Sequence, residues 1–147
     1  MDIFQILKKD HQAVKDLFRK LEGTGARASK SREKLFTQLK EDLEAHSQGE
    51  EAAFYSTLKE HTEMQAMIEE ATEEHDEVAN LLEEMEELDI ESEDWTSKLA
   101  ELQKNVLHHV KEEEGEIFKK AKEIMGKDEM QTLGKEFQSA KKQAAAG

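Results

Sequence analysis

Apolar residues recur at steps of three and four along almost the whole chain, a pattern typical of amphipathic helices. The pattern predicts four long helices, which run from Phe4 to Leu21, from Ser31 to Leu58, from Thr62 to Met85 and from Ser92 to Ile124. The segment Gly23-Thr24-Gly25 is expected to end the first helix. Thr62 with Gln65 resembles a capping box, and Ser92 is a candidate N-cap.

Four such helices with short connections predict an all-α protein, an up-and-down antiparallel four-helix bundle with a short C-terminal helical extension. Residues 1–126 are expected to form the bundle, and residues 127–147 a C-terminal helix with a frayed tail from Lys141 onward. The extension has an apolar side at Met130, Leu133 and Phe137. No linker-like stretch divides the chain into two domains.

Each apolar stripe is interrupted by ionisable residues. They occur at the same steps of three and four as the apolar residues and therefore lie on the same face of the helix. The interruptions are His11 in the first helix, His46 and Glu50 in the second, His75 in the third, and His109 and Glu113 in the fourth. Counted along antiparallel helices that rise about 1.5 Å per residue, the four histidines come to nearly one level. Buried imidazole and carboxylate groups are costly unless they are paired or bind a metal. The six residues are therefore candidate metal ligands.

An internal repeat supports this interpretation. The segments that begin at His46 and at His109 both read H-x-x-x-E-E-x-x followed by two large apolar residues. His11 precedes the first copy by 35 residues, and His75 precedes the second by 34. The chain thus consists of two helical hairpins that each offer two histidines and one glutamate, which suits a pair of metal ions.

Four imidazoles and two carboxylates give each of two ions about two nitrogen and two oxygen ligands. This set leaves room for a solvent bridge and an open position, which fits redox-active iron better than closed tetrahedral zinc. We therefore expect two non-haem iron ions bridged by an oxo or hydroxo group. The alternative, that six unrelated polar residues form a cluster without function, is disfavoured because perturbed ionisable clusters usually mark sites.

Other polar residues near the stripes are expected to lie outside the metal shell. His108 faces solvent on its helix, and His61 lies about three turns from Glu50. Glu51 and Glu114 are off the stripe and are expected to be solvated, with an outer-shell role as the alternative. Tyr55 is expected to pack in the core, with a redox role as the less favoured alternative.

Composition narrows the choice of partners. The formal net charge is -14 and there is no cysteine, so nucleic acid and anionic membrane surfaces are disfavoured and thiolate ligands are excluded. The N-terminus has no signal-peptide pattern, and no apolar stretch approaches the roughly 20 residues needed to cross a bilayer. We expect a cytoplasmic protein that binds no nucleic acid and no membrane.

The paired H-x-x-x-E-E segments resemble the hemerythrin-like HHE cation-binding domain over about residues 1 to 125. The resemblance implies metal ligation by the same six residues and a function in binding or reacting with oxygen, peroxide or nitric oxide. Oxygen-carrying hemerythrins have a fifth histidine one turn after the first ligand of the third helix, where this chain has Ala79.

The leading functional hypothesis is a non-haem di-iron protein that binds or reacts with a small molecule at a His4Glu2 site. The alternative is an iron- or oxygen-sensing module, or a metal-binding module, that acts through a protein partner the sequence does not identify. A purely structural adaptor is the least favoured of the three. The sequence leaves open whether the protein is an enzyme.

Overall fold

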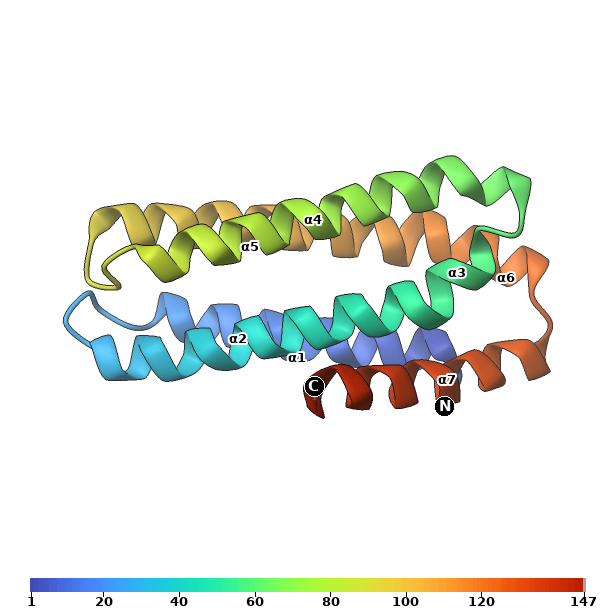
Figure 1. Ribbon diagram of the computed structural model, residues 1–147, viewed down its shortest axis with the longest axis horizontal. Helices are drawn as coiled ribbons and strands as arrows, with labels where there is room; N and C mark the ends of the chain where they lie inside the picture. The colour runs from blue at the N-terminus through green and yellow to red at the C-terminus, as the bar shows by residue number, and fades with distance from the viewer. Residues whose placement is uncertain (147) are drawn as a thin grey trace.

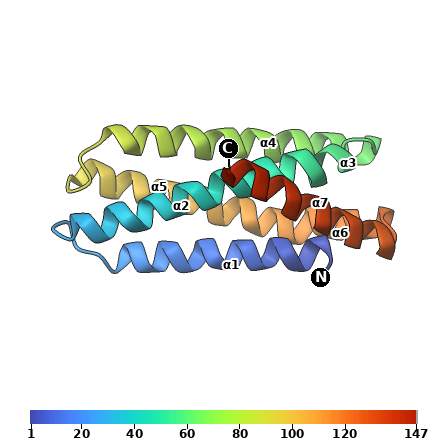
Figure 2. The same cartoon turned by 60° about the horizontal axis from the view of Figure 1, so that its bottom comes forward.

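The computed structural model describes residues 1–146, and in this part of the chain helices are joined by short turns with no strand, as predicted. Four long helices lie side by side: α1 (Ile3–Glu22), α2 (Ser29–Gly49), α4 (Gln65–Glu87) and α5 (Glu93–Glu112). Successive long helices run in opposite directions, and the two views agree on this arrangement (Figures 1 and 2). Within residues 1–146, no helix is both long and apolar enough to span a bilayer.

Two of the long helices continue through short π-helical segments that the sequence pattern does not predict. α2 passes into η1 (Glu50–Tyr55) and then α3 (Ser56–Leu58), whereas α5 passes into η3 (Glu113–Ile117) and α6 (Phe118–Ile124). Single π turns inside helices are often found at functional sites. Each of these segments begins at a glutamate of the internal repeat, so the irregularity coincides with the candidate ligands.

The predicted helix ends are correct at Gly23 and at Ser92 and wrong at Thr62. α1 ends at Glu22, and Gly23 is its C-cap. Ser92 caps α5, because its hydroxyl accepts a hydrogen bond from the Trp95 amide at 3.2 Å. The capping box predicted at Thr62 and Gln65 is wrong: Thr62 lies inside a 3-10 turn, η2 (Thr62–Met64), that has no side-chain cap. The Gln65 side chain instead donates to the Lys59 carbonyl at 3.1 Å, which gives this carbonyl of the preceding turn a hydrogen-bonding partner.

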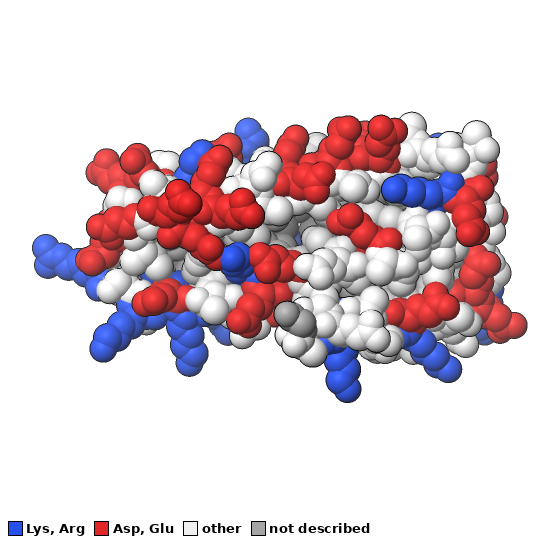
Figure 3. All heavy atoms as spheres, in the orientation of Figure 1, with Lys and Arg blue, Asp and Glu red and all other residues white. Residues whose placement is uncertain are grey.

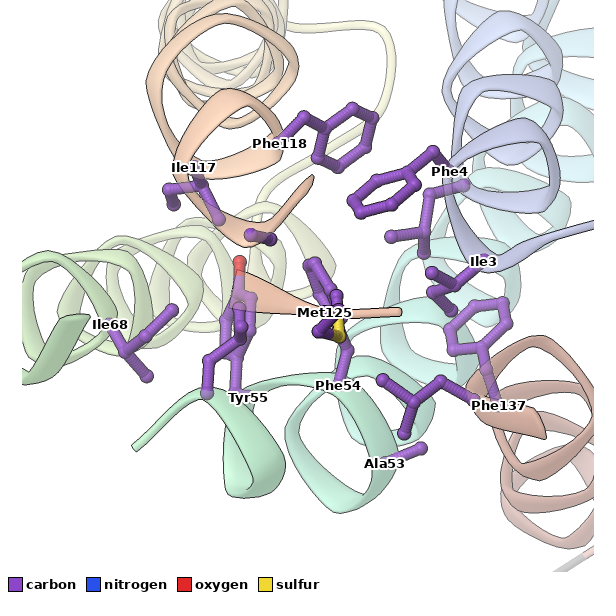
Figure 4. Close-up of a cluster of buried hydrophobic side chains, with 14 of the residues drawn as sticks. Ile3, Phe4, Ala53, Phe54, Tyr55, Ile68, Ile117, Phe118, Met125 and Phe137 are labelled. Atoms are coloured by element: carbon purple, nitrogen blue, oxygen red, sulfur yellow. The ribbon is translucent and has the colours of Figure 1, made fainter. Parts of the chain in front are cut away.

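The apolar core is divided into two clusters. One surrounds Phe18, Leu39 and Trp95 toward the α1–α2 loop, and the other surrounds Phe4, Phe54 and Phe118 toward α3 and α6. Figure 4 shows the second cluster, to which α1, η1, α4, α6 and α7 all contribute side chains. The six candidate ligands are buried and belong to neither apolar cluster.

The C-terminal helix α7 (Lys127–Ala146) is as long as α1 and returns along the outside of α2, η1 and α1 (Figure 2). The segment expected to be frayed is helical from Lys141 through Ala146, and Gly147 lies outside the described residues. Two contacts hold this end. Phe137 is fully buried in the core, and Lys141 Nζ lies 2.6 Å from Asp10 Oδ1.

Replacing Phe137 with alanine should lower the free energy of unfolding by about 3–5 kcal/mol, because a fully buried aromatic ring is removed from the core. Gln138→Ala, a change at the next, exposed position, should stay within about 0.5 kcal/mol of the wild type. Urea denaturation followed by circular dichroism measures both. Equal stability of the two variants would show that α7 is not part of the core.

Candidate metal centre

The structure brings all six predicted ligands together in one buried layer between the long helices. Within that layer, His11, His46, Glu50 and Glu113 form one group whose nitrogen and oxygen atoms lie within 4.8 Å of one another. Glu50, His75 and His109 form an adjoining group at the same spacing. Because Glu50 belongs to both groups, the layer has the form of two neighbouring cation sites that share a carboxylate.

Helix geometry explains how each hairpin contributes to the layer. His46 Nε2 lies 3.6 Å from Glu50 Oε1, and His109 Nε2 lies 3.4 Å from Glu113 Oε2, both across an i,i+4 step. The second hairpin contributes across the bundle, since His75 Nε2 lies 3.1 Å from Glu50 Oε1. In the same way, His11 Nε2 lies 3.1 Å from Glu113 Oε1.

Five of the atoms that face this layer have no hydrogen-bonding partner. In the described part of the chain, the buried side-chain nitrogen and oxygen atoms without a hydrogen bond are His11 Nε2, His75 Nε2, Glu113 Oε1 and both carboxylate oxygens of Glu50. The short contacts among them lack the geometry of a hydrogen bond. Buried polar atoms are normally paired, so five orphaned atoms at one place fit a cation site.

Each histidine of the layer has a carboxylate on its outward Nδ1. Asp10 accepts from His46 at 2.8 Å and Glu74 accepts from His109 at 2.7 Å. A carboxylate on Nδ1 fixes the tautomer and the ring orientation, so that the Nε2 lone pair is available to a metal. These two acids belong to the same hairpin as the histidine that they contact.

The remaining two acids connect the hairpins. Glu114 accepts from His11 Nδ1 at 2.6 Å, and Glu51 accepts from His75 Nδ1 at 2.9 Å. The outer-shell role considered for Glu51 and Glu114 is therefore the one that the geometry supports.

Sequence analysis missed Asp10 and Glu74, although a signal for them was present. Each comes directly before the first histidine of its hairpin, so both hairpins begin with an acid-His pair and continue with H-x-x-x-E-E. In the structure, the first acid contacts the second histidine of its own hairpin, whereas the last glutamate contacts the first histidine of the other hairpin.

Tyr55 was expected to pack in the core, and its ring does so, stacked on His75 with 5.3 Å between centroids. Its hydroxyl, however, reaches the layer, where it donates to Glu113 and lies 3.4 Å from His109 Nε2. Burial and then the charges of Glu113 and Glu50 raise the pKa of Tyr55 well above its ordinary value. Tyr55 is thus a neutral hydrogen-bond donor beside the candidate ligands.

The pKa values of the two central carboxylates, Glu50 and Glu113, are shifted in opposite directions. Burial, followed by the charge of Glu113, raises the pKa of Glu50 well above its ordinary value. Burial would also raise the pKa of Glu113, but the close imidazoles of His109 and His11 outweigh it and hold that pKa well below its ordinary value. Glu50 is therefore the carboxylate of the pair that holds a proton more readily, and a cation bound there would compete with that proton.

A cavity of about 30 Å³ lies against the four histidines. The histidines, Asp10 and Ser47 form its polar wall, and its apolar wall consists of Val14, Leu43, Val78, Val106 and Val110. Glu50 and Glu113 do not line it, so it opens onto the face of the layer away from the central carboxylates. A space this small admits only a molecule of one or two heavy atoms, or water.

The two histidines predicted to lie outside the site are not among these ligand groups. His108 is largely exposed and lies 3.0 Å from Glu112, and His61 precedes η2 at a turn. With Glu74 and Glu112, His108 forms only a partly exposed surface group.

Comparisons with known proteins give the family. Residues 2–121 match the family model of the Hemerythrin HHE cation binding domain, which is most of the chain. The chain therefore belongs to the hemerythrin HHE cation-binding domain family, as the sequence motifs predicted. α7 lies beyond the matched residues.

A solved structure has the same fold. The crystal structure of a hemerythrin HHE cation binding domain-containing protein from Mycobacterium kansasii superposes with a TM-score of 0.86 and 22% sequence identity, covering 99% of this chain and 88% of that one. A curated relative, described as a DNA nickase from Nostoc sp. strain PCC 7120, is 24% identical over 141 residues. That match covers 96% of this chain but only 39% of the relative.

Adjacent histidines provide a matched test of the ligand assignment. His109→Ala should weaken metal binding at least about tenfold, since even outer-shell losses cost that much. His108→Ala, at the exposed neighbouring position, should bind metal as the wild type does. Titration with Co²⁺ followed by elemental analysis measures both variants. A His108 variant that loses as much metal as the His109 variant would show that the helix face is misassigned.

The affinity for metal should rise with pH. In the metal-free protein, burial lowers the pKa of His109, but hydrogen bonds to Glu113 and Glu74 outweigh it and raise the value to about 9. A proton then competes with the metal for this imidazole below pH 9. The raised pKa also stabilises the folded metal-free protein below pH 6.5, and this contribution is lost as the pH rises through about 9.

Competition between the protein and a chelator for Co²⁺, measured from pH 7 to 9, tests whether the affinity for metal rises. Thermal melts of the metal-free protein over the same range should show that its stability falls as the pH rises. His61→Ala serves as the control and should give the same slopes. An affinity that stays constant or falls over this range would contradict the protonation of His109.

Proposed function

We propose that this chain is a non-haem di-iron protein, built as an up-and-down four-helix bundle, that reacts with a small molecule at a His4Glu2 site. The observation that carries the proposal is the set of orphaned buried atoms in one layer, together with four histidines whose Nδ1 atoms are already bound to carboxylates. The metal ligands in this proposal are His11, His46, Glu50, His75, His109 and Glu113.

The chemistry of the donors favours iron. Two imidazoles for each ion, with Glu50 shared by both groups and Glu113 close to both His11 and His109, would give about four protein ligands per ion and leave further positions open. When bound, a pair of irons would supply electrons and an open position for a small oxidant or for nitric oxide. The chain's own part is to aim four Nε2 lone pairs, to hold a neutral Tyr55 hydroxyl on Glu113, and to exclude bulk water.

The size of the cavity favours a diatomic molecule or peroxide as the partner. Its volume of about 30 Å³ and its valine-rich wall exclude an organic substrate from the four histidines. The apolar wall also lowers the local dielectric, which strengthens the electrostatic interactions of the layer. Oxygen, peroxide and nitric oxide all meet these limits.

Two features favour reaction over reversible oxygen carriage. Each half of the layer has two histidines, and Ala79, at the position of the carriers' fifth histidine, is exposed and has no ligand atom. Neither iron would therefore be saturated by protein, and both would be open to oxidants. A sensor that acts through a partner protein remains the second candidate, since it would use the same site.

DNA nicking is not carried over from the Nostoc relative. The chain spans 39% of that protein, and the chain as a whole bears a formal net charge of -14, which repels a phosphate backbone. Figure 3 shows acidic side chains spread over much of one face of the molecule.

A two-step experiment tests the proposal. Anaerobic loading should give about two irons per chain, because two half-sites converge on shared carboxylates. The diferrous protein is then exposed to oxygen and returned to vacuum while its optical spectrum is followed. We expect irreversible oxidation and subsequent consumption of added peroxide. One iron per chain would contradict the dinuclear site, and repeated reversible cycling of the spectrum would indicate a carrier.

A further inference from the structure

The helix α7 packs against α1, α2 and η1, the elements of the first hairpin. We call His11 and His46 the α1–α2 half, and His75 and His109 the α4–α5 half. Lys141 Nζ lies 2.6 Å from Asp10 Oδ1, while the other oxygen of Asp10 accepts from His46 Nδ1 at 2.8 Å. One carboxylate therefore bridges a lysine of α7 and a candidate metal ligand of α2.

Two further contacts between α7 and α2 lie at the same place. The Phe137 ring meets the His46 ring edge to face, with 5.5 Å between centroids and 74° between planes. Gly49 allows α7 to approach, because a Cβ there would lie 3.1 Å from the Phe137 ring and 3.2 Å from the Lys141 backbone nitrogen. A Cβ at position 49 would therefore require the Phe137 ring or the α7 backbone to shift by a few tenths of an ångström.

The other three outer-shell acids have no such support. Within residues 1–146, the recorded ion pairs of Glu51, Glu74 and Glu114 involve histidines, and no lysine or arginine contacts these three carboxylates. Asp10 is also less exposed than Glu51 or Glu114. The two hairpins are therefore alike in sequence but differ in what holds their histidines.

We propose that Lys141 is a positioning residue that, through Asp10, fixes the His46 imidazole and makes the α1–α2 half of the centre hold its metal more firmly than the α4–α5 half. This inference rests on the proposed function, because it presumes two bound metal ions. Lys141 does not touch the ligand layer, and the contact that links its ammonium group to His46 runs through the carboxylate of Asp10. With both its oxygens bound, Asp10 has only one favourable orientation toward Nδ1.

Without the lysine, one oxygen of Asp10 loses its partner, and the side chain is close enough to the surface to turn toward water. His46 would then lose the acceptor that sets its tautomer. Loss of an outer-shell partner typically weakens metal binding 10- to 100-fold. We expect loss of the Lys141 charge to weaken metal binding by this factor in the α1–α2 half and to leave binding in the α4–α5 half unchanged.

The test compares Lys141→Met with Lys142→Met. Methionine retains most of the stem that packs near Gly49 but removes the charge, and Lys142 is the exposed neighbour. Wild-type protein is first loaded with Co²⁺ and shown to bind two ions; a lower number would count against the proposed function and not against the role of Lys141. Release of Co²⁺ to excess chelator is then followed optically, with a slow and a fast phase expected for the wild type.

In Lys141→Met, the slow phase should accelerate about tenfold or more while the fast phase stays unchanged. Lys142→Met should release Co²⁺ at the wild-type rates. Lys141→Arg should retain the slow phase of the wild type because it keeps the positive charge. Unchanged release in Lys141→Met from protein that holds two ions would overturn the proposal. Equal acceleration of both phases would overturn it as well, since that result indicates general loosening of the bundle.

A second readout requires no metal. In metal-free protein labelled with ¹⁵N-histidine, the Nδ1–H resonance of His46 should broaden or shift toward free exchange in Lys141→Met, whereas that of His75 should not. Unchanged His46 resonances would contradict the coupling from Lys141 through Asp10, whatever the metal content of the protein.

Discussion

The structure depends on the burial of two carboxylates, Glu50 and Glu113, which are completely inaccessible to solvent and face the same narrow layer. Two buried anions at this separation are unfavourable, and the surrounding residues are arranged to reduce that cost. Four imidazoles turn their Nε2 atoms inward, the Tyr55 hydroxyl donates to Glu113, and the raised pKa of Glu50 favours its protonated form. The same arrangement makes the layer a suitable place for metal ions.

The acids outside this layer make the histidines rigid. Every histidine of the layer binds a carboxylate through Nδ1, and two of those contacts join one hairpin to the other. The layer therefore connects the four long helices at their middle, between two apolar clusters that pack independently of each other. A preorganised site of this kind is built mainly from regular helices, which fix side-chain positions more closely than loops do.

Much of the centre was predictable because helical periodicity and polar interruptions are local properties of a sequence. His46 with Glu50, and His109 with Glu113, share a helix face at an i,i+4 step whatever the tertiary structure. The repeat of the hairpins identified His11 and His75 as their partners. The outer acids Asp10 and Glu74 were missed because an acid beside a histidine on a charged helix surface is usually solvated. Only the packing of neighbouring helices turns these two acids toward Nδ1.

The sequence by itself determined the helical class, the phase of each apolar stripe and the six residues that meet in the core, because a helix converts spacing directly into direction. Only the tertiary structure decided what lies beyond one helix turn or between helices. It decided the π-helical segments at Glu50 and Glu113, the reach of the Tyr55 hydroxyl, and the return of α7 onto α2. These features arise from contacts between residues far apart in the chain, such as Lys141 with Asp10, and no local pattern encodes such distances.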